Sequence, residues 1–427
     1  MKIVLINSPV RRRSPHSRLA PPLGLAYIAS VLLMEGYEVS AVDFNVSGLN
    51  LNRVDRLVEV EKPALVGISA HTETYPNALQ IARRIKAKAP ETKVVLGGPH
   101  PTLLPGEILA EEAVDFVVVG EGEETMVELA RHLTTGLGEP GDIKGLGYKD
   151  RAGPRVNARR KPLHPDAFPY PARELFPLEF YEDKWNVLTA RGGCPFKCPF
   201  CSASAIWGGR RRARIPKHVV GEVEALSERY GATYVFFADD IFTLNHRWVR
   251  ELLDLLVKLD RRPEWGCATR VDLVDQKLLR EMAKAGCRAI QFGVESGSQR
   301  ILDSVKGIKK EQVLRAVQAA VGAGIEVASS FMIPFPEDTR ESIKETKDFI
   351  KQLYYAGSKV LLSYTSPYPG THFYQNAAEL GIKLLTDRWE EFDAKHNVLE
   401  TKHLSAQEIE ELVQEIVEET GLIKAVV

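Results

Sequence analysis

The sequence predicts an α/β protein in which a Rossmann-like, doubly wound sheet is followed by a partial (β/α)6 barrel and a short C-terminal helical segment. Two observations support this. Short runs of Val, Ile and Leu alternate with amphipathic stretches along most of the chain, which is typical of parallel sheets covered by helices on both faces. The chain is also 427 residues long, and roughly 150 residues per domain suggests two or three domains.

The first domain is expected over residues 1–138. KIVLINSP predicts a buried strand, and residues 21–37 predict a helix that begins at two prolines and ends near Gly36. Four further strands are expected at EVSAVDFN, LVGISA, KVVLGG and FVVVGEGE, with helices over 76–89, 106–113 and up to Thr134. A ligand of such a sheet binds beyond the carboxyl ends of its strands.

Residues 139–183 differ in character, because Gly and Pro are frequent and a basic run, RVNARRKP, occupies 155–162. We interpret this segment as a linker or strap between the domains. A basic run of this kind is more often a solvated surface than a binding site.

The alternation resumes over residues 184–385. Six strands are expected there, at NVLTARGG, TYVFFADD, EWGCATRV, AIQFGVES, EVASSFMI and VLLSYTSP. With helices between them, they predict a curved, partly open parallel barrel. Residues 386–427 contain Ser405 followed by Glu408, a capping-box pattern that predicts a closing helix.

Composition excludes several classes of protein. Lys and Arg number 56 and Asp and Glu 57, giving a formal charge of −1, so nucleic acid is not an expected partner. The apolar runs are of strand length, which predicts no membrane span. The N-terminus lacks the apolar region of a signal peptide, and we therefore expect a cytoplasmic protein.

The five cysteines are too few, and odd in number, for a disulfide framework. Cys194, Cys198 and Cys201 lie within eight residues, and three thiolates on one loop can each bind one iron of a [4Fe–4S] cube, leaving the fourth iron open. A structural zinc site is the weaker alternative, because no nearby Cys or His completes a tetrahedral set. Cys267 and Cys287 are expected to be core residues.

The motif Cys-x-x-x-Cys-x-Phe-Cys, with Phe200 as its aromatic residue, resembles that of the radical S-adenosylmethionine (SAM) enzymes. The resemblance extends through the barrel in the segments FFADDIFT, ATRVD, FGVESGS and YTSPYPGT. It implies that SAM chelates the open iron and is cleaved to a 5′-deoxyadenosyl radical. With Phe200, the SAM-binding residues that it implies are Asp239, Asp240, Arg270 and Glu295.

Chemistry supports these SAM assignments, since an ammonium, a carboxylate and a ribose diol require acidic acceptors and a cationic fork. Ordinary salt bridges at strand ends are the alternative role for the same residues. One departure from the family is SSFMIPFPEDT, where many relatives have a Gly-rich FMxGxPGET; Pro334 and Pro336 put the adenine contacts in question.

The first domain resembles the cobalamin-binding domain of class B radical SAM methyltransferases. The segments that carry the resemblance are PPLGLAYIA, ISAHT, GGPHPT and GEGE. Glycines after a strand let the backbone approach a cofactor tail, although Gly-rich strand ends also serve phosphates or simple turns. The cobalamin residues expected are Ser69, His71, Thr72, Gly97, Gly98, His100, Gly120 and Glu121.

The Asp-x-His-x-x-Gly motif that supplies a histidine to cobalt in other cobalamin enzymes is absent. We therefore expect no histidine ligand to cobalt, with ligation by His71 or His16 as the alternative. A weakly ligated cobalt favours transfer of a methyl radical.

Together these resemblances imply a cobalamin-dependent radical SAM C-methyltransferase. The 5′-deoxyadenosyl radical takes hydrogen from an unactivated sp3 carbon, which then collects a methyl group from methylcobalamin. A ferredoxin or flavodoxin type electron donor is the expected redox partner. A non-methylating ring formation, ring contraction or carbon–carbon coupling is the main alternative; a cofactor-binding sensor and a tRNA-modifying enzyme are weaker ones.

The substrate is the least determined part of the prediction. The whole chain resembles, weakly, the methanogen enzymes that C-methylate a glutamine of methyl-coenzyme M reductase, which implies a protein acceptor. Small natural products and lipids remain open. Tyr364 and Tyr368 are candidates to line the substrate space, with core packing as their other role.

Overall fold

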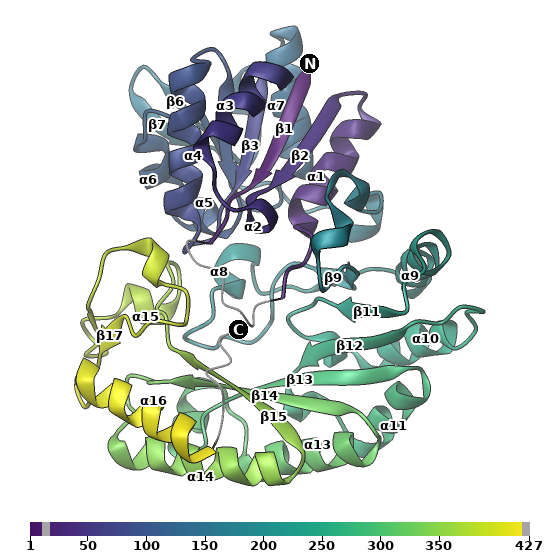
Figure 1. Ribbon diagram of the computed structural model, residues 1–427, viewed down its shortest axis with the longest axis vertical. Coiled ribbons are helices and arrows are strands. Elements are labelled where there is room, and N and C mark those ends of the chain that lie inside the picture. Colours follow the sequence, from purple (N-terminus) through teal and green to yellow (C-terminus); the bar gives the residue numbers. More distant parts are fainter. Residues whose placement is uncertain (11–17, 421–427) are drawn as a thin grey trace.

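The structure is a computed structural model that describes residues 1–10 and 18–420. Figure 1 shows two α/β bodies, with the N-terminal sheet domain above the barrel and the C-terminal segment along one side of the barrel. Helix α8 (Ala203–Trp207) lies between the two bodies. The predicted tandem of a doubly wound sheet and a partial barrel is confirmed.

The N-terminal domain is a seven-stranded sheet in the order β2-β1-β3-β4-β5-β6-β7, of which the first five strands are parallel. Side chains alternate between its faces, as in any strand: Ile3 and Leu5 of β1 pack under α1 and α7, while Val4 and Ile6 pack under α3 and α4. The parallel strands are β1 (Lys2–Asn7), β2 (Glu38–Asp43), β3 (Leu65–Ser69), β4 (Lys93–Gly97) and β5 (Phe116–Val118). The helices are α1 (Leu23–Met34), α2 (Phe44–Ser47), α3 (Leu51–Glu61), α4 (Tyr75–Lys88), α5 (Pro99–Leu103), α6 (Pro105–Ala110) and α7 (Glu123–Thr135).

The segment expected to be a linker begins with a β-hairpin. β6 (Leu146–Asp150) pairs antiparallel with β5, and β7 (Gly153–Val156) pairs antiparallel with β6, so the sheet extends beyond the predicted boundary at residue 138. The turn is closed where the Asp150 carboxylate accepts the Ala152 N–H at 2.7 Å. Pro154 is tolerated because β7 is an edge strand.

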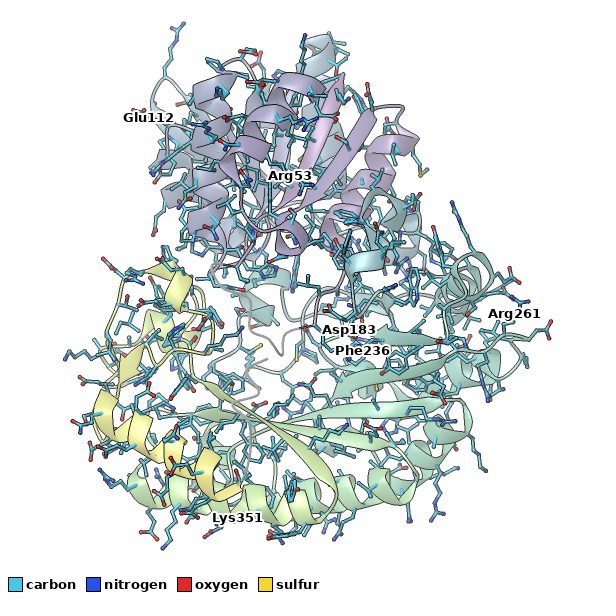
Figure 2. The ribbon with its side chains drawn as sticks, in the orientation of Figure 1. Arg53, Glu112, Asp183, Phe236, Arg261 and Lys351 are labelled. Atoms are coloured by element: carbon cyan, nitrogen blue, oxygen red, sulfur yellow. The ribbon has the colours of Figure 1, made fainter. Side chains whose placement is uncertain are left out.

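The rest of the segment runs between the domains in short turns, as a strap. Its last residue, Asp183, forms an ion pair with Arg18 at 2.9 Å, and its backbone N–H donates to the Leu19 carbonyl. Figure 2 labels Asp183 beside Phe236 of the second barrel strand, where the strap meets the barrel. The strap therefore contacts both bodies.

The barrel has six parallel strands in the order β15-β14-β13-β12-β11-β8, with helices along its outer side (Figure 1), as predicted. Its core contains Cys267 and Cys287, both fully buried, which confirms them as core residues. The strands are β8 (Asn186–Val187), β11 (Tyr234–Phe237), β12 (Glu264–Thr269), β13 (Cys287–Glu295), β14 (Glu326–Ile333) and β15 (Ser358–Tyr364). The helices are α9 (Pro216–Tyr230), α10 (His246–Leu256), α11 (Gln276–Lys284), α12 (Gln299–Val305), α13 (Lys310–Gly322) and α14 (Arg340–Tyr355).

The C-terminal segment contains α15 (His372–Gln375), the two-stranded β16 (Lys383–Leu384) and β17 (Leu399–Glu400), and α16 (Ala406–Thr420). The predicted capping box is present: the Ser405 hydroxyl accepts the Glu408 N–H at 3.4 Å, and the Ser405 N–H donates to the Glu408 carboxylate at 2.9 Å. In the described parts of the chain, no helix combines the length and the apolar character that a membrane crossing requires.

Ser405→Ala removes the cap of α16 and is expected to lower the opening free energy of this helix by about 1 kcal/mol. Hydrogen exchange of the α16 amides measures this change. Gln407→Ala, which loses only a contact with Glu411 on the helix surface, is the control and is expected to stay within about 0.5 kcal/mol of the wild type. Equal effects of the two substitutions would contradict the capping role.

Candidate active site

The three cysteines lie in a loop enclosed by a small hairpin. β9 (Ala190–Arg191) and β10 (Arg212–Ala213) pair antiparallel, and residues 192–211 between them carry the cysteines and α8. All three thiols are partly buried. The Cys201 N–H donates to the Cys198 carbonyl at 3.1 Å, which closes the turn between these two cysteines.

The donor set fits an iron–sulfur cube better than a single ion. Across residues 1–10 and 18–420, no three His, Cys, Asp or Glu side chains converge where one metal ion could bind. Thiols that each hold a different iron satisfy this observation, whereas a tetrahedral zinc site does not. Burial raises the pKa of all three thiols, that of Cys201 to about 11, so thiolate ligation releases protons.

Two glycines before Cys194 allow the loop to fold back on itself. Gly192 has φ +84°, a conformation that L side chains rarely adopt. A Cβ at Gly193 would overlap the carbonyl oxygen of Gly208, which follows α8. This close backbone approach holds the start of the cysteine loop against its far end, and sequence patterns alone did not single out either glycine for that purpose.

Asp239 and Asp240 follow β11 but have different surroundings. The Asp239 carboxylate accepts the N–H groups of Thr189 and Ala190, both at 3.1 Å, and also the Thr189 hydroxyl. Arg211 lies 3.7 Å from it. Asp240 faces the cavity and, within the described chain, its carboxylate has no hydrogen bond or ion pair. Asp239 therefore organises the strand end, and the prediction of a SAM ammonium contact now favours Asp240.

Arg270 supports the cysteine loop directly. Its guanidinium lies 3.8 Å from the centroid of the Phe196 ring, and Nη1 is 4.0 Å from Cys198 Sγ. The remaining donors bind Asp272 at 2.9 and 3.0 Å and the Lys306 carbonyl at 3.1 Å. The guanidinium therefore has no free pair of N–H donors with which to bind the SAM carboxylate. The predicted SAM role of Arg270 is not supported by these contacts.

Glu295 ends β13 with φ +79°, rare for a residue with a side chain. Its carboxylate forms a buried ion pair with Lys306 at 2.6 Å, and the same ammonium donates to the Gly293 carbonyl at 2.6 Å. Phe200 packs among aromatic rings, 5.6 Å from Phe335 between centroids. The SAM roles of Glu295 and Phe200 stay predictions.

One cavity of about 350 Å³ joins the two domains. Cys194, Asp240 and Trp207 line it from the barrel side, and the carboxyl ends of β3, β4 and β5 line it from the sheet side. Of the predicted cobalamin residues, those at its wall are Ser69, Gly97, Gly98, Gly120 and Glu121. No described histidine lines it. Cobalt without a histidine ligand stays a prediction, because His16 lies outside the described residues.

The structure does not bring His71, Thr72 and His100 to this cavity. His71 is exposed, while His100 is fully buried with Nδ1 3.3 Å from the Thr72 hydroxyl. The His100 ring lies 4.6 Å from that of Tyr75 and 5.0 Å from that of Trp389, and burial lowers its pKa to about 4. The loops after β3 and β4 turn away from the strand ends, so His100 and Thr72 help to pack the C-terminal segment instead.

The cavity continues into an apolar slot on the sheet face beneath α1 and α7, which fits the tail of a large cofactor. Leu5, Val95 and Met126 line this slot. Gly67 of β3 lies between them: a Cβ there would come within 2.9 Å of Leu5 Cδ2 and 3.6 Å of Met126 Cε. A side chain at position 67 would fill the slot. Gly98, at φ +101°, also lines the cavity, and a Cβ there would come within 2.8 Å of the Ala70 carbonyl oxygen.

Tyr364 and Tyr368 lie outside the cavity wall. The Tyr364 hydroxyl donates to Glu410 of α16 at 2.6 Å, and its ring belongs to the barrel core. Burial raises the pKa of Tyr368. The structure supports packing for Tyr364, whereas Tyr368 is half-buried and its role stays a prediction.

Comparisons with known proteins agree with this geometry. A model of the Radical SAM superfamily matches residues 190–350, and a B12 binding domain model matches residues 18–130. A curated "uncharacterized methyltransferase" of Pyrococcus horikoshii is 33% identical over 426 residues, covering 97% of this chain and 91% of the relative. The chain belongs to the cobalamin-binding radical SAM methyltransferase family. Its cofactors are a [4Fe–4S] cluster, SAM and cobalamin, as predicted.

Two further comparisons show the breadth of this family. The anaerobic magnesium-protoporphyrin IX monomethyl ester cyclase of Rubrivivax gelatinosus is 31% identical over 354 residues, 76% of this chain and 61% of the cyclase. The structure of the radical SAM methyltransferase TsrM from Kitasatospora setae matches with a TM-score of 0.79 at 19% identity, covering 98% of this chain and 88% of TsrM. The second likeness shows the shared fold.

Gly193→Ala is expected to abolish cluster binding, because a Cβ at this position overlaps the Gly208 carbonyl. Iron content and the visible absorption of the reconstituted cluster measure the loss. Gly209→Ala is the matched control on the facing segment, where a Cβ meets no atom within 4 Å. Full iron content in the Gly193 variant would show that the close approach is dispensable.

Gly67→Val fills the apolar slot and is expected to weaken cobalamin binding by roughly tenfold or more, about 1.4 kcal/mol, while iron content stays unchanged. Titration with cobalamin followed by absorbance measures the affinity. Gly106→Ala, in the same domain at a site with no atom within 4 Å of a new Cβ, is expected to bind normally. Unchanged affinity of the Gly67 variant would place the cofactor tail elsewhere.

Proposed function

We propose that this enzyme transfers a methyl group to an unactivated sp3 carbon. The observation that supports the proposal is the shared cavity, which reaches Cys194 and Asp240 at the barrel mouth and Ser69 and Gly98 at the sheet. A methyl transfer between separate cofactors requires that both open into one space with the acceptor between them.

The residues of this chain would bind and orient the reactants. Cys194, Cys198 and Cys201 hold the cluster, and Arg270 steadies their loop from behind Phe196. When bound, SAM at the cluster supplies a hydrogen-abstracting radical and cobalamin supplies the methyl group. Asp240 offers a carboxylate to a cationic group in the cavity. The apolar lining from α1 and β5 keeps water from the reacting carbon.

For the acceptor, we keep the prediction of a protein side chain such as a glutamine of methyl-coenzyme M reductase, and of a ferredoxin or flavodoxin as the reductant. One relative favours a second candidate function: the cyclase of Rubrivivax gelatinosus carries a name that describes ring formation. A ring-forming reaction uses the same radical without net methyl transfer.

The test is an anaerobic assay of the reconstituted enzyme with cobalamin, a low-potential reductant and SAM labelled with CD3. Extract from a host strain that lacks the gene supplies acceptors. We expect 5′-deoxyadenosine together with a CD3 label on carbon in a digested protein, both detected by mass spectrometry.

Cys198→Ala is expected to remove both products, because the cluster loses a ligand; Cys267→Ala, in the barrel core away from the cluster loop, is the control and is expected to retain both. Formation of 5′-deoxyadenosine with a dehydrogenated or cyclised product and no label would overturn methylation in favour of ring formation. Label in the small-molecule fraction alone would overturn the protein acceptor.

A further inference from the structure

Two ion pairs connect the cobalamin-binding domain to the hairpin that encloses the cluster loop. Glu121 and Glu123 follow β5, at the start of α7, and they pair with Arg212 of β10 and Arg191 of β9. Arg191 and Arg212 are register partners across the two hairpin strands. The two ion pairs therefore hold both ends of the segment that carries the three cysteines.

The Arg191 pair is the more buried of the two. Only 9% of the Arg191 side chain and 5% of the Glu123 side chain are exposed. The Arg191 guanidinium also lies 4.3 Å from the ring centroid of Tyr27 on α1 and 4.7 Å from that of Phe168 in the strap. A planar cation between two aromatic faces and a carboxylate has little freedom to move.

The second pair lies at the rim of the same contact. The Arg212 and Glu121 side chains are 16% and 17% exposed, and Arg212 also donates to the Leu163 carbonyl of the strap. Burial raises the pKa of Glu121, which Arg212 opposes. Glu121 was expected to bind cobalamin, but its carboxylate is engaged by the barrel.

Three of these four residues, Glu121, Glu123 and Arg191, also line the interdomain cavity. Buried ion pairs contribute little net stability because desolvation offsets their attraction, and their best-attested use is to fix one arrangement among several. Apolar packing between the domains would tolerate sliding, whereas two charge pairs at opposite strands of one hairpin do not.

We propose that the Glu121–Arg212 and Glu123–Arg191 pairs form a two-point clamp that fixes the cobalamin-binding domain against the cluster hairpin and so couples SAM cleavage to methyl transfer. This inference rests on the proposed function and makes the four side chains positioning residues. Breaking the clamp leaves each cofactor in its own domain but loosens their mutual placement.

The test compares the double variant Glu121→Gln/Glu123→Gln with the wild type, both loaded with cluster and cobalamin. We expect iron and cobalamin contents near those of the wild type and continued formation of 5′-deoxyadenosine. The amount of methylated product per 5′-deoxyadenosine is expected to fall on the order of 10²-fold, since about 1 Å of misplacement can cost that much.

A spectroscopic measurement keeps the clamp testable if the enzyme proves not to methylate. The reduced cluster speeds the electron-spin relaxation of nearby cob(II)alamin, so paramagnetic resonance of the holoenzyme reports how firmly the two centres are held together. Slower or more heterogeneous relaxation in the double variant supports the clamp whatever the product; identical relaxation and an unchanged product ratio overturn it.

Asp55→Asn is the matched control, because Asp55 pairs with Arg84 between α3 and α4 inside the cobalamin-binding domain, with 14% of its side chain exposed. It is expected to leave both the product ratio and the relaxation unchanged. If the double variant does not fold, Glu121→Gln alone tests the rim pair with the same two measurements; wild-type values for both would overturn the proposal.

Discussion

The site depends on a property of parallel sheets: all their strands end at the same edge, where backbone groups and loops are free to bind ligands. This chain has two such sheets, and the carboxyl ends of β3–β5 and of the barrel strands β8 and β11 line one cavity. Neither sheet alone would enclose it. The relative placement of the two domains is therefore as much a part of the active site as any side chain.

Sequence patterns predicted most elements that bury a regular face, but they missed α3, whose Val54 and Val58 pack against the N-terminal sheet. Short apolar runs and amphipathic stretches located the six barrel strands and most of the helices between them, because each buries an apolar side against the same core. The β6–β7 hairpin escaped because its strands are short, polar and at a sheet edge, so little apolar burial marks them. The short α12 was not predicted either, since its seven residues span barely two turns.

Sequence analysis predicted the site residues whose chemical type is required by a cofactor. It could not predict where the fold places each of those side chains. The cysteine spacing indicated a cluster, and the glycines after β4 indicated a close backbone approach. His71 and His100 were expected to bind cobalamin, but α5 turns His100 into the core against Trp389, and His71 faces solvent. The orientation of His100 depends on its contact with Trp389, nearly 300 positions away in the sequence, and no local pattern contains that information.

The charged residues around the cavity distinguish Asp239 from Asp240, which sequence patterns alone could not tell apart. The acidic residues at its wall, other than Asp240, each have an arginine partner in the described chain: Glu121, Glu123 and Asp239 pair with Arg212, Arg191 and Arg211. Asp240 has no such ion pair among the described residues: burial raises its pKa, and Arg211 opposes only part of that rise. When ligands displace water from the cavity, an unpaired carboxylate becomes costly unless a cation accompanies them. We therefore expect a cationic ligand such as SAM at Asp240, whereas Asp239 already pairs with Arg211 and binds the backbone at the start of β9.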